Sequence, residues 1–324
     1  MDWRRLSLAA LLAPLARPVA GPGPTAEHGS TRPGPATAAL GTSGDRAEDP
    51  GSGGRRSRPV PPQPVTLGGA RVVQVDQTTC GSTVLLMLAA TGDPVLARWL
   101  ETGELPADLP PHRVPPEIPR DGELRPARPH GAAERMAAAQ QHIKARTVAR
   151  ALGLLPWPAG LGTPPWTAAR EARFPGVRYQ HLPLDDAAPG TAPLLAATHA
   201  ATLAGTPVPL YAGGDLGRGV ATAVPRHVVL AVPPPAAAPH RGRDGTGNPV
   251  LHLYEPSGGH VHQVPIADLL GRSEPHPALG GWSHVAWVLL PRRRSGGAAV
   301  EAVASARGRG QAGEDRRSSE KEEP

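Results

Sequence analysis

Helix-forming and strand-forming segments are separated along this chain, and their order limits the folds that are open to it. The first two thirds contain the helix patterns, which start at or just after Cys80 and continue at 132–152, 162–172 and 190–204. The last third contains β-rich runs bounded by Pro and Gly, at 206–214, 226–232, 251–256 and 284–291. Helices followed by strands predict an α+β domain with an antiparallel sheet.

Pro and Gly are concentrated at the N-terminus and in loops, which reduces the part of the chain that can fold. They number 42 and 39 of 324 residues, near the level at which low-complexity stretches are expected. Residues 21–64 have almost no apolar periodicity and are predicted to be a disordered linker. Residues 292–324 are predicted to be a disordered charged tail, which leaves one domain of ordinary size at 65–291.

The first twenty residues have features of a weak secretory signal. Arg4 and Arg5 precede a short apolar stretch at 6–16, and small residues follow it. This pattern predicts a signal peptide at 1–20 and a secreted or cell-surface protein. A cytoplasmic location is the alternative, because Pro14 interrupts the apolar stretch. No other stretch is apolar for 18 residues, so no stable membrane span is expected.

The formal net charge of +6 raises the question of a nucleic-acid partner. The basic residues are nearly all Arg, and they are scattered or lie in tails such as 292–294. No basic helix and no strand with interleaved aromatic residues accompanies them. We therefore expect no nucleic-acid partner, and the sequence does not indicate an oligomeric state.

The chain has a single cysteine, Cys80, which rules out an internal disulfide and a Cys-based zinc site. A thiol nucleophile must be ionised, and it needs a nearby base and donors that face the developing negative oxygen. Cys80 lies where a helix should begin, with Thr78 and Thr79 expected to cap it, and a helix N-terminus favours the thiolate. Gly81 follows, and we expect it to let a substrate backbone approach closely.

Three further residues supply the other parts of such a site. Gln74 lies six positions before Cys80 and is the candidate oxyanion donor, with Gln77 as a rival. His227 opens an apolar strand and is the candidate general base. Glu255 ends the next strand, which antiparallel pairing brings beside the first, and it is the candidate acid that orients the imidazole. The alternatives are a solvent-facing Gln, a core His and an ordinary strand-end acid.

Taken in order, these motifs resemble the papain-like cysteine peptidases, in particular the bacterial group similar to the double-glycine leader peptidases. That group has a Gln six residues before Cys-Gly, a strand reading His and three apolar residues, and an apolar strand ending Asp-Pro-x-x-Gly. The corresponding segments here are QVDQTTCG, HVVL and EPSGG. Glu255 departs from the usual Asp or Asn, and Ser82-Thr83 departs from the pair that commonly follows Cys-Gly.

The resemblance implies a papain-like fold in which an N-terminal helix bearing Cys80 packs on an antiparallel sheet. It also implies a peptide or protein substrate, hydrolysis of a peptide or related amide bond through an acyl-thioenzyme, and no cofactor. Cys80 would attack, Gln74 would hold the oxyanion, His227 would move the proton and Glu255 would orient His227. Acyl transfer and cell-wall amide cleavage stay open, because the same triad supports them.

Two readings without catalysis also stay open. A papain-like domain that has lost its activity would bind a peptide or a partner in its cleft. Alternatively, His252, His260 and His262 fall within eleven positions and are candidates for a transition-metal site. In that case His260 and His262 would share one strand face and His252 would reach them across the turn. Trp282 and Trp287, at strand positions, are expected in the core or in the wall of a cleft.

Overall fold

The computed structural model describes residues 61–120, 131–149, 151–186, 188, 191–214, 225–235, 242–244 and 247–293. The predicted signal peptide lies outside these residues, as do 21–60 of the predicted linker and 294–324 of the predicted tail. The sheet extends slightly beyond the expected domain. Residues 63–64 already form an edge strand, and the last strand continues to Arg293.

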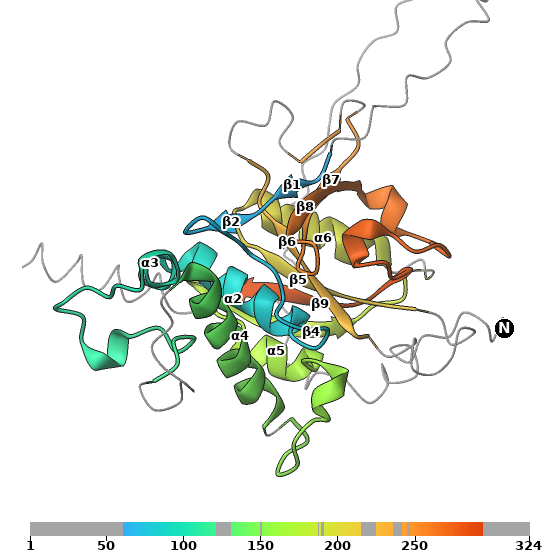
Figure 1. Ribbon diagram of the computed structural model, residues 1–324. Helices are drawn as coiled ribbons and strands as arrows, with labels where there is room; N and C mark the ends of the chain where they lie inside the picture. Colours follow the sequence, from blue (N-terminus) through green and yellow to red (C-terminus); the bar gives the residue numbers. More distant parts are fainter. Residues whose placement is uncertain are drawn as a thin grey trace, which may run out of the picture.

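The fold is α+β and is built on a seven-stranded sheet in which every neighbouring pair is antiparallel (Figure 1). The strands follow the order β1 (Gln63–Pro64), β8 (His260–Pro265), β7 (Val250–Glu255), β6 (His227–Val232), β5 (Val208–Gly213), β9 (His284–Arg293) and β4 (Val177–Pro183). The four predicted strands are confirmed as β5, β6, β7 and β9. The strands β4 and β8 were not among the predicted β-rich runs, although the three-histidine alternative placed His260 and His262 on a strand. A separate hairpin joins β2 (Thr66–Leu67) to β3 (Ala70–Arg71).

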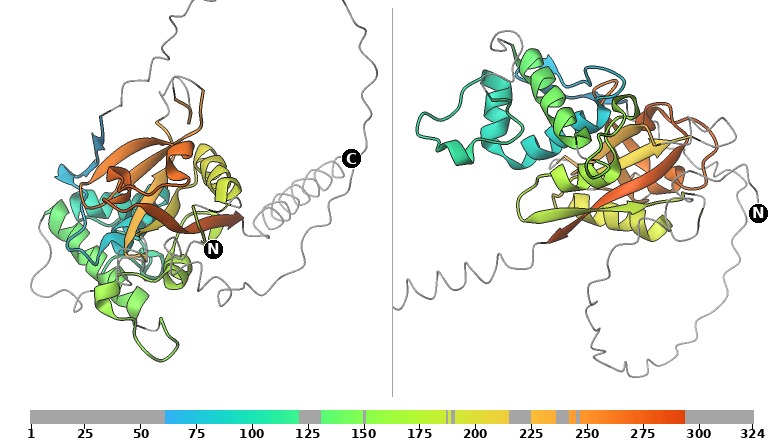
Figure 2. Two further views of the ribbon diagram at one scale, coloured as in Figure 1. Left: turned by 90° about the vertical axis from the view of Figure 1, so that its right-hand side faces the viewer. Right: turned by 90° about the horizontal axis from the view of Figure 1, so that it is seen from below.

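Helices lie on both sides of this sheet (Figure 2). They are α2 (Cys80–Gly92), α3 (Pro94–Thr102), α4 (Ala132–Val148), α5 (Pro165–Glu171) and α6 (Thr191–Leu203). Helix α6 covers one face, and α2 packs on the other with α3, α4 and α5 around it. The predicted helical segments are confirmed as α2, α4, α5 and α6. Single 3₁₀ turns are η2 (Pro111–Arg113), η3 (Ala159–Leu161), η5 (Ile266–Leu269) and η6 (Pro277–Leu279).

The core has two layers because the central strands are buried on both faces. In β6, Val228 and Leu230 pack toward α2, whereas Val229 and Ala231 pack toward α6, as the period of a strand requires. All three tyrosines are buried, and each hydroxyl donates to a backbone carbonyl. These bonds are Tyr179 to Pro207, Tyr211 to Thr163 and Tyr254 to Val72, at 2.8, 3.0 and 2.9 Å. Each buried hydroxyl is therefore satisfied.

The end of α2 differs from the expectation that Gly92 caps it. Gly92 is the last helical residue, and Phe174 and Pro175 pack so closely on it that a Cβ there would lie 2.4 Å from Pro175. Asp93 follows and caps α3, since its carboxylate accepts from two backbone N–H groups of that helix. Asp93 also pairs with Arg173 at 2.6 Å, and Arg173 holds buried Glu117 at 2.7 Å.

Among the described residues, no single helix has the length and apolar composition needed to cross a membrane. Helices α2 and α3 pass that test only as a pair, and the chain bends by 115° between them.

Candidate functional site

The loop before α2 is a turn built on Asp76. Its carboxylate accepts from the backbone N–H of Thr78 at 2.7 Å and from the Thr78 hydroxyl at 2.6 Å. The Thr79 hydroxyl accepts from the Asp76 N–H and donates to the Asp76 carbonyl, at 3.0 and 2.9 Å. Thr79 is therefore the N-cap residue by position only. The expectation that Thr78 and Thr79 cap α2 with their side chains is wrong. The hydroxyls hold the turn instead.

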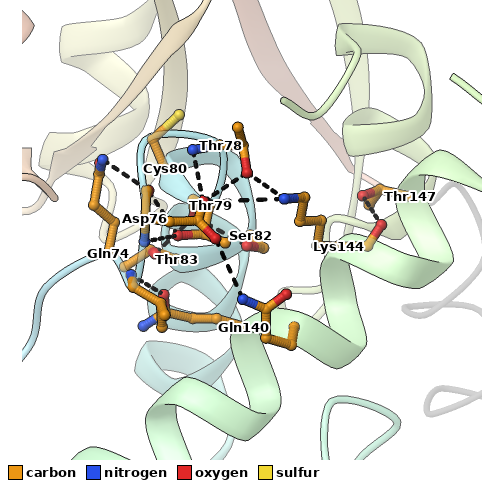
Figure 3. A network of polar contacts seen from close by, with 12 residues as sticks. Gln74, Asp76, Thr78, Thr79, Cys80, Ser82, Thr83, Gln140, Lys144 and Thr147 are labelled. Atoms are coloured by element: carbon orange, nitrogen blue, oxygen red, sulfur yellow. Dashed lines mark hydrogen bonds and ion pairs between the residues drawn. The ribbon is translucent and has the colours of Figure 1, made fainter. Parts of the chain in front are cut away.

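Helix α4 holds this loop from the side with the polar side chains of Gln140 and Lys144 (Figure 3). Buried Gln140 accepts from the N–H of Val75 at 3.0 Å and donates to the carbonyl of Val73 at 2.9 Å, so one amide satisfies two backbone groups. Lys144 donates to the Thr78 hydroxyl and lies 4.0 Å from the Asp76 carboxylate.

The charge and hydrogen bonds around Asp76 keep it ionised. Burial acts to raise the pKa of Asp76, but hydrogen bonds from Thr78 and the charge of Lys144 outweigh burial and lower it. An anion that stays charged across the neutral range keeps the turn in one conformation. The loop is thus fixed before α2 begins.

Cys80 is the first residue of α2, and it is 1% exposed. Its backbone N–H belongs to the first turn, where no helical carbonyl is available to accept it. The sulfur lies 3.3 Å from the carbonyl of Arg226, which directly precedes β6. The start of the helix therefore meets the start of the strand that carries His227, although 146 positions separate the bonded residues.

Gly81 is needed for packing within the protein and not for a substrate backbone, contrary to the expectation. A Cβ at this position would lie 2.7 Å from the Cβ of Thr163 and 3.5 Å from a methyl group of Val228. Gly81 is buried against these residues. Its missing side chain lets α2 approach the loop before α5 and the start of β6.

His227, the first residue of β6, is 6% exposed and lies between Cys80 and Glu255. Its Nε2 is 2.9 Å from Oε1 of Glu255. The contact is an ion pair too bent for a linear hydrogen bond, since Nε2 has no partner within ordinary angular limits. Burial acts to lower the pKa of His227. The contacts of the ring with Cys80 and Glu255, and the negative charges of both groups, overcome burial and raise the pKa of His227 to about 9.

Glu255 reaches the ring of His227 diagonally across two paired strands. The pairing of β6 with β7, predicted from the sequence, puts Tyr254 opposite Leu230, so Glu255 comes level with a position two residues beyond His227. The longer side chain spans this diagonal. The carboxylate also accepts from the N–H and hydroxyl of Ser257 and from the N–H of Gly258.

These donors keep Glu255 charged. Burial acts to raise the pKa of Glu255, but His227, Ser257 and the N–H of Gly258 lower it to about 2. Glu255 is only 4% exposed, so water screens its interaction with His227 weakly. The acid can therefore hold one orientation of the imidazole.

Gly280, the residue after η6, packs against the imidazole ring of His227. Its φ is +64°, in the left-handed region, and a Cβ there would lie 2.5 Å from Nε2 of His227. Any side chain at this position would displace the imidazole.

A pocket of about 330 Å³ opens beside these residues. Gln74, the predicted oxyanion donor, lines it together with His227 and Trp282. The Gln74 Nε2 donates to the Asp76 carbonyl at 3.0 Å, and its Oε1 is buried without a hydrogen-bond partner. The rival donor Gln77 also lines the pocket. Trp282 is thus a wall residue, as one expectation had it, whereas Trp287 belongs to the core.

The three-histidine metal site is wrong, and the strand register gives the reason. His260 and His262 do share one face of β8, with ring centroids 6.4 Å apart. His252, however, pairs with Gln263, so its side chain projects from the opposite face of the sheet. Among the described residues, no group of three His, Cys, Asp or Glu side chains is arranged to hold a metal ion.

Comparison of this chain with protein-family models, with curated proteins and with solved structures gave no match.

Sequence reasoning missed the residues that support the site. Gln140 and Lys144 lie in an Ala-rich helix, where a polar side chain usually faces solvent, so their role could not be read from the pattern. Gly280 was readable only as part of a Gly-Gly turn. The buried Gln140 was detectable in principle, because it lies one helical turn from Met136 and on the same face.

Proposed function

We propose that this chain is a papain-like thiol hydrolase, similar to the bacterial double-glycine leader peptidases, which cleaves a peptide or related amide bond through an acyl-thioenzyme. One observation carries the proposal. The chain's single cysteine begins a buried helix and meets a histidine that a buried carboxylate holds from the other side.

In the first half of the reaction, the Cys80 sulfur attacks the carbonyl carbon of the amide after His227 has taken the thiol proton. The carbonyl oxygen becomes negative, and the Cys80 N–H and the Gln74 amide donate to it. His227 then gives its proton to the leaving nitrogen, the C–N bond breaks and an amine departs. Gln74 must release the Asp76 carbonyl to take this role.

In the second half, a water molecule attacks the thioester. His227 removes a proton from the water, the C–S bond breaks, and the sulfur regains a proton as the acid product leaves. Glu255 stays charged throughout. It holds Nε2 of His227, which leaves Nδ1 as the ring nitrogen for the sulfur. No step requires a cofactor.

The second candidate is a papain-like domain that binds a peptide without cleaving it. One observation favours it: Cys80 is only 1% exposed, so a substrate reaches the sulfur only after some movement of the pocket wall. A binding module has no need of a reactive thiolate, and the reactivity of Cys80 therefore separates the two candidates.

The test is alkylation of Cys80 by iodoacetamide at pH 7, followed by mass spectrometry of the intact chain. We expect the protein to react faster than free cysteine, and the His227→Ala variant to lose at least tenfold in rate because its base and counter-ion are gone. The control is the His142→Ala variant, since His142 lies on the exposed part of α4. Equal rates for the wild-type protein and His227→Ala would remove His227 from the mechanism.

A further inference from the structure

One cation in the pocket has no carboxylate to balance it within the described part of the chain. Arg226 lines the pocket, and its Nε atom is buried and has no hydrogen-bond partner. Burying a guanidinium N–H without an acceptor is unfavourable, because the group loses its contact with water and gains nothing in return. A ligand that drew the guanidinium toward the pocket and supplied an acceptor would remove this penalty.

The other charged groups near the pocket are already paired. Lys144 lies 4.0 Å from the carboxylate of Asp76, and His227 lies 2.9 Å from Glu255, whose second oxygen accepts from Gly258. Neither carboxylate is left for Arg226. The unpaired guanidinium of Arg226 therefore favours an anionic ligand.

The position of Arg226 ties this anion to the reacting bond. Its carbonyl is 3.3 Å from the Cys80 sulfur, and the next residue is His227. Gly160 and Gly162 form part of the same wall. An anion held there would belong to a residue that adjoins the amide which Cys80 attacks.

We propose that Arg226 binds a carboxylate of the substrate next to the scissile amide, a role that rests on the proposed function. A guanidinium presents parallel N–H groups that match the two oxygens of a carboxylate. The carboxylate is either an acidic side chain or a free C-terminus, and both offer the same chemistry to Arg226.

The first test compares two alkylating reagents that differ in charge. Iodoacetate is an anion and iodoacetamide is its neutral counterpart, so the ratio of their rates at Cys80 measures the attraction of an anion to the site. We expect Arg226→Gln to lower this ratio about tenfold, the effect of one charge-assisted contact, and Arg226→Lys to restore part of it. Arg113→Gln, on exposed η2, removes the same charge elsewhere and should leave the ratio unchanged.

His227 attracts iodoacetate as well, but it is present in every variant and cancels from the comparison. If Arg226→Gln slows both reagents equally, Arg226 acts on the sulfur and the carboxylate proposal is overturned. An unchanged rate with both reagents overturns it too.

The second test measures binding without chemistry, in the Cys80→Ala variant, by isothermal titration calorimetry. Three acetylated tetrapeptides serve as probes: one with Glu and an amidated end, one with Gln and an amidated end, and the Gln peptide with a free C-terminus. We expect the Glu peptide or the free-ended peptide to bind about tenfold more tightly than the neutral one, and Arg226→Gln to abolish the difference.

The arm that shows the preference identifies the source of the carboxylate. Equal binding of all three peptides overturns the inference. An inert Cys80 together with carboxylate-dependent binding would remove the proposed hydrolase and keep the Arg226 site, so the two failures are distinguishable.

Discussion

Replacing Glu255 with Gln removes the charge that holds His227 and keeps the shape of the side chain. The two interacting atoms are 2.9 Å apart, and the charges, which are spread over the ring and the carboxylate, are centred about 4 Å apart. At an effective dielectric constant near 20, this separation corresponds to about 4 kcal/mol. The Gln carbonyl dipole replaces part of this energy, so we expect a loss of about 2 kcal/mol. The pKa of His227 should then fall by about 1.5.

The assay is a pH titration of the His227 ring by NMR, with His227→Gln used to assign its signal among 13 histidines. In the wild-type protein the titration should be centred near pH 9. In Glu255→Gln it should move down, and Glu255→Asp should lie between the two because a shorter carboxylate keeps the charge at a longer distance. A midpoint that is the same in all three proteins would refute the idea that Glu255 stabilises the imidazolium.

The same substitution changes the dependence of stability on pH. The pKa of Glu255 is lowered on folding, from 4.5 to about 2, so its carboxylate stabilises the fold above about pH 4.5. This contribution is lost as the pH falls from 4.5 toward 2. The pKa of His227 is raised, so its contribution is present below about pH 6.5 and is lost as the pH rises toward 9. Thermal unfolding of Glu255→Gln should be less sensitive to pH in both windows.

Two further substitutions test the packing around the site. Gly280→Ala should displace the His227 ring and abolish rapid alkylation of Cys80. Gly281→Ala is the control, because Gly281 also has a positive φ but a Cβ there would have no atom within 4 Å, and this variant should keep the rapid alkylation. An equal loss in both variants would show that backbone strain alone is responsible. Gln140→Ala should lower the free energy of unfolding by about 2 kcal/mol, because it leaves two buried backbone groups unpaired, and chemical denaturation should show it. Gln141→Ala, which removes one long contact of 3.4 Å, should cost under about 0.5 kcal/mol, and matching losses would contradict the reasoning.

The sequence could predict the elements whose patterns are local and strong. Helix α2 was recognisable because its residues are apolar nearly all round, and β6 because an apolar run begins at His227. Strand β8 was not among the predicted β-rich runs because it has His, Gln and Val without a clear apolar face, and it is stabilised by pairing with β7. Pairing with a neighbouring strand decides such a strand, and local propensity does not.

The candidate site was predictable in its members and not in its supports. Cys80, His227 and Glu255 could be selected because each begins or ends an element, where side chains of different elements meet. The role of Gly81 was misjudged, since only the structure reveals Thr163 against it. The three-histidine metal site is wrong because His252 pairs with Gln263 and so lies on the other face of the sheet from His260 and His262. This depends on the strand register, which cannot be read from the spacing in the sequence.

The residue that follows α2 affects the position of the sulfur at the other end of the helix. Asp93 joins α2 to α3 and is tied to Arg173, while Gln140 and Lys144 fasten the loop where α2 begins. A helix that is anchored at both termini cannot slide along its axis. Slippage by a single residue would carry the sulfur about 1.5 Å from its partner. Contacts at both ends of α2 therefore fix the position of the Cys80 thiol before a ligand binds.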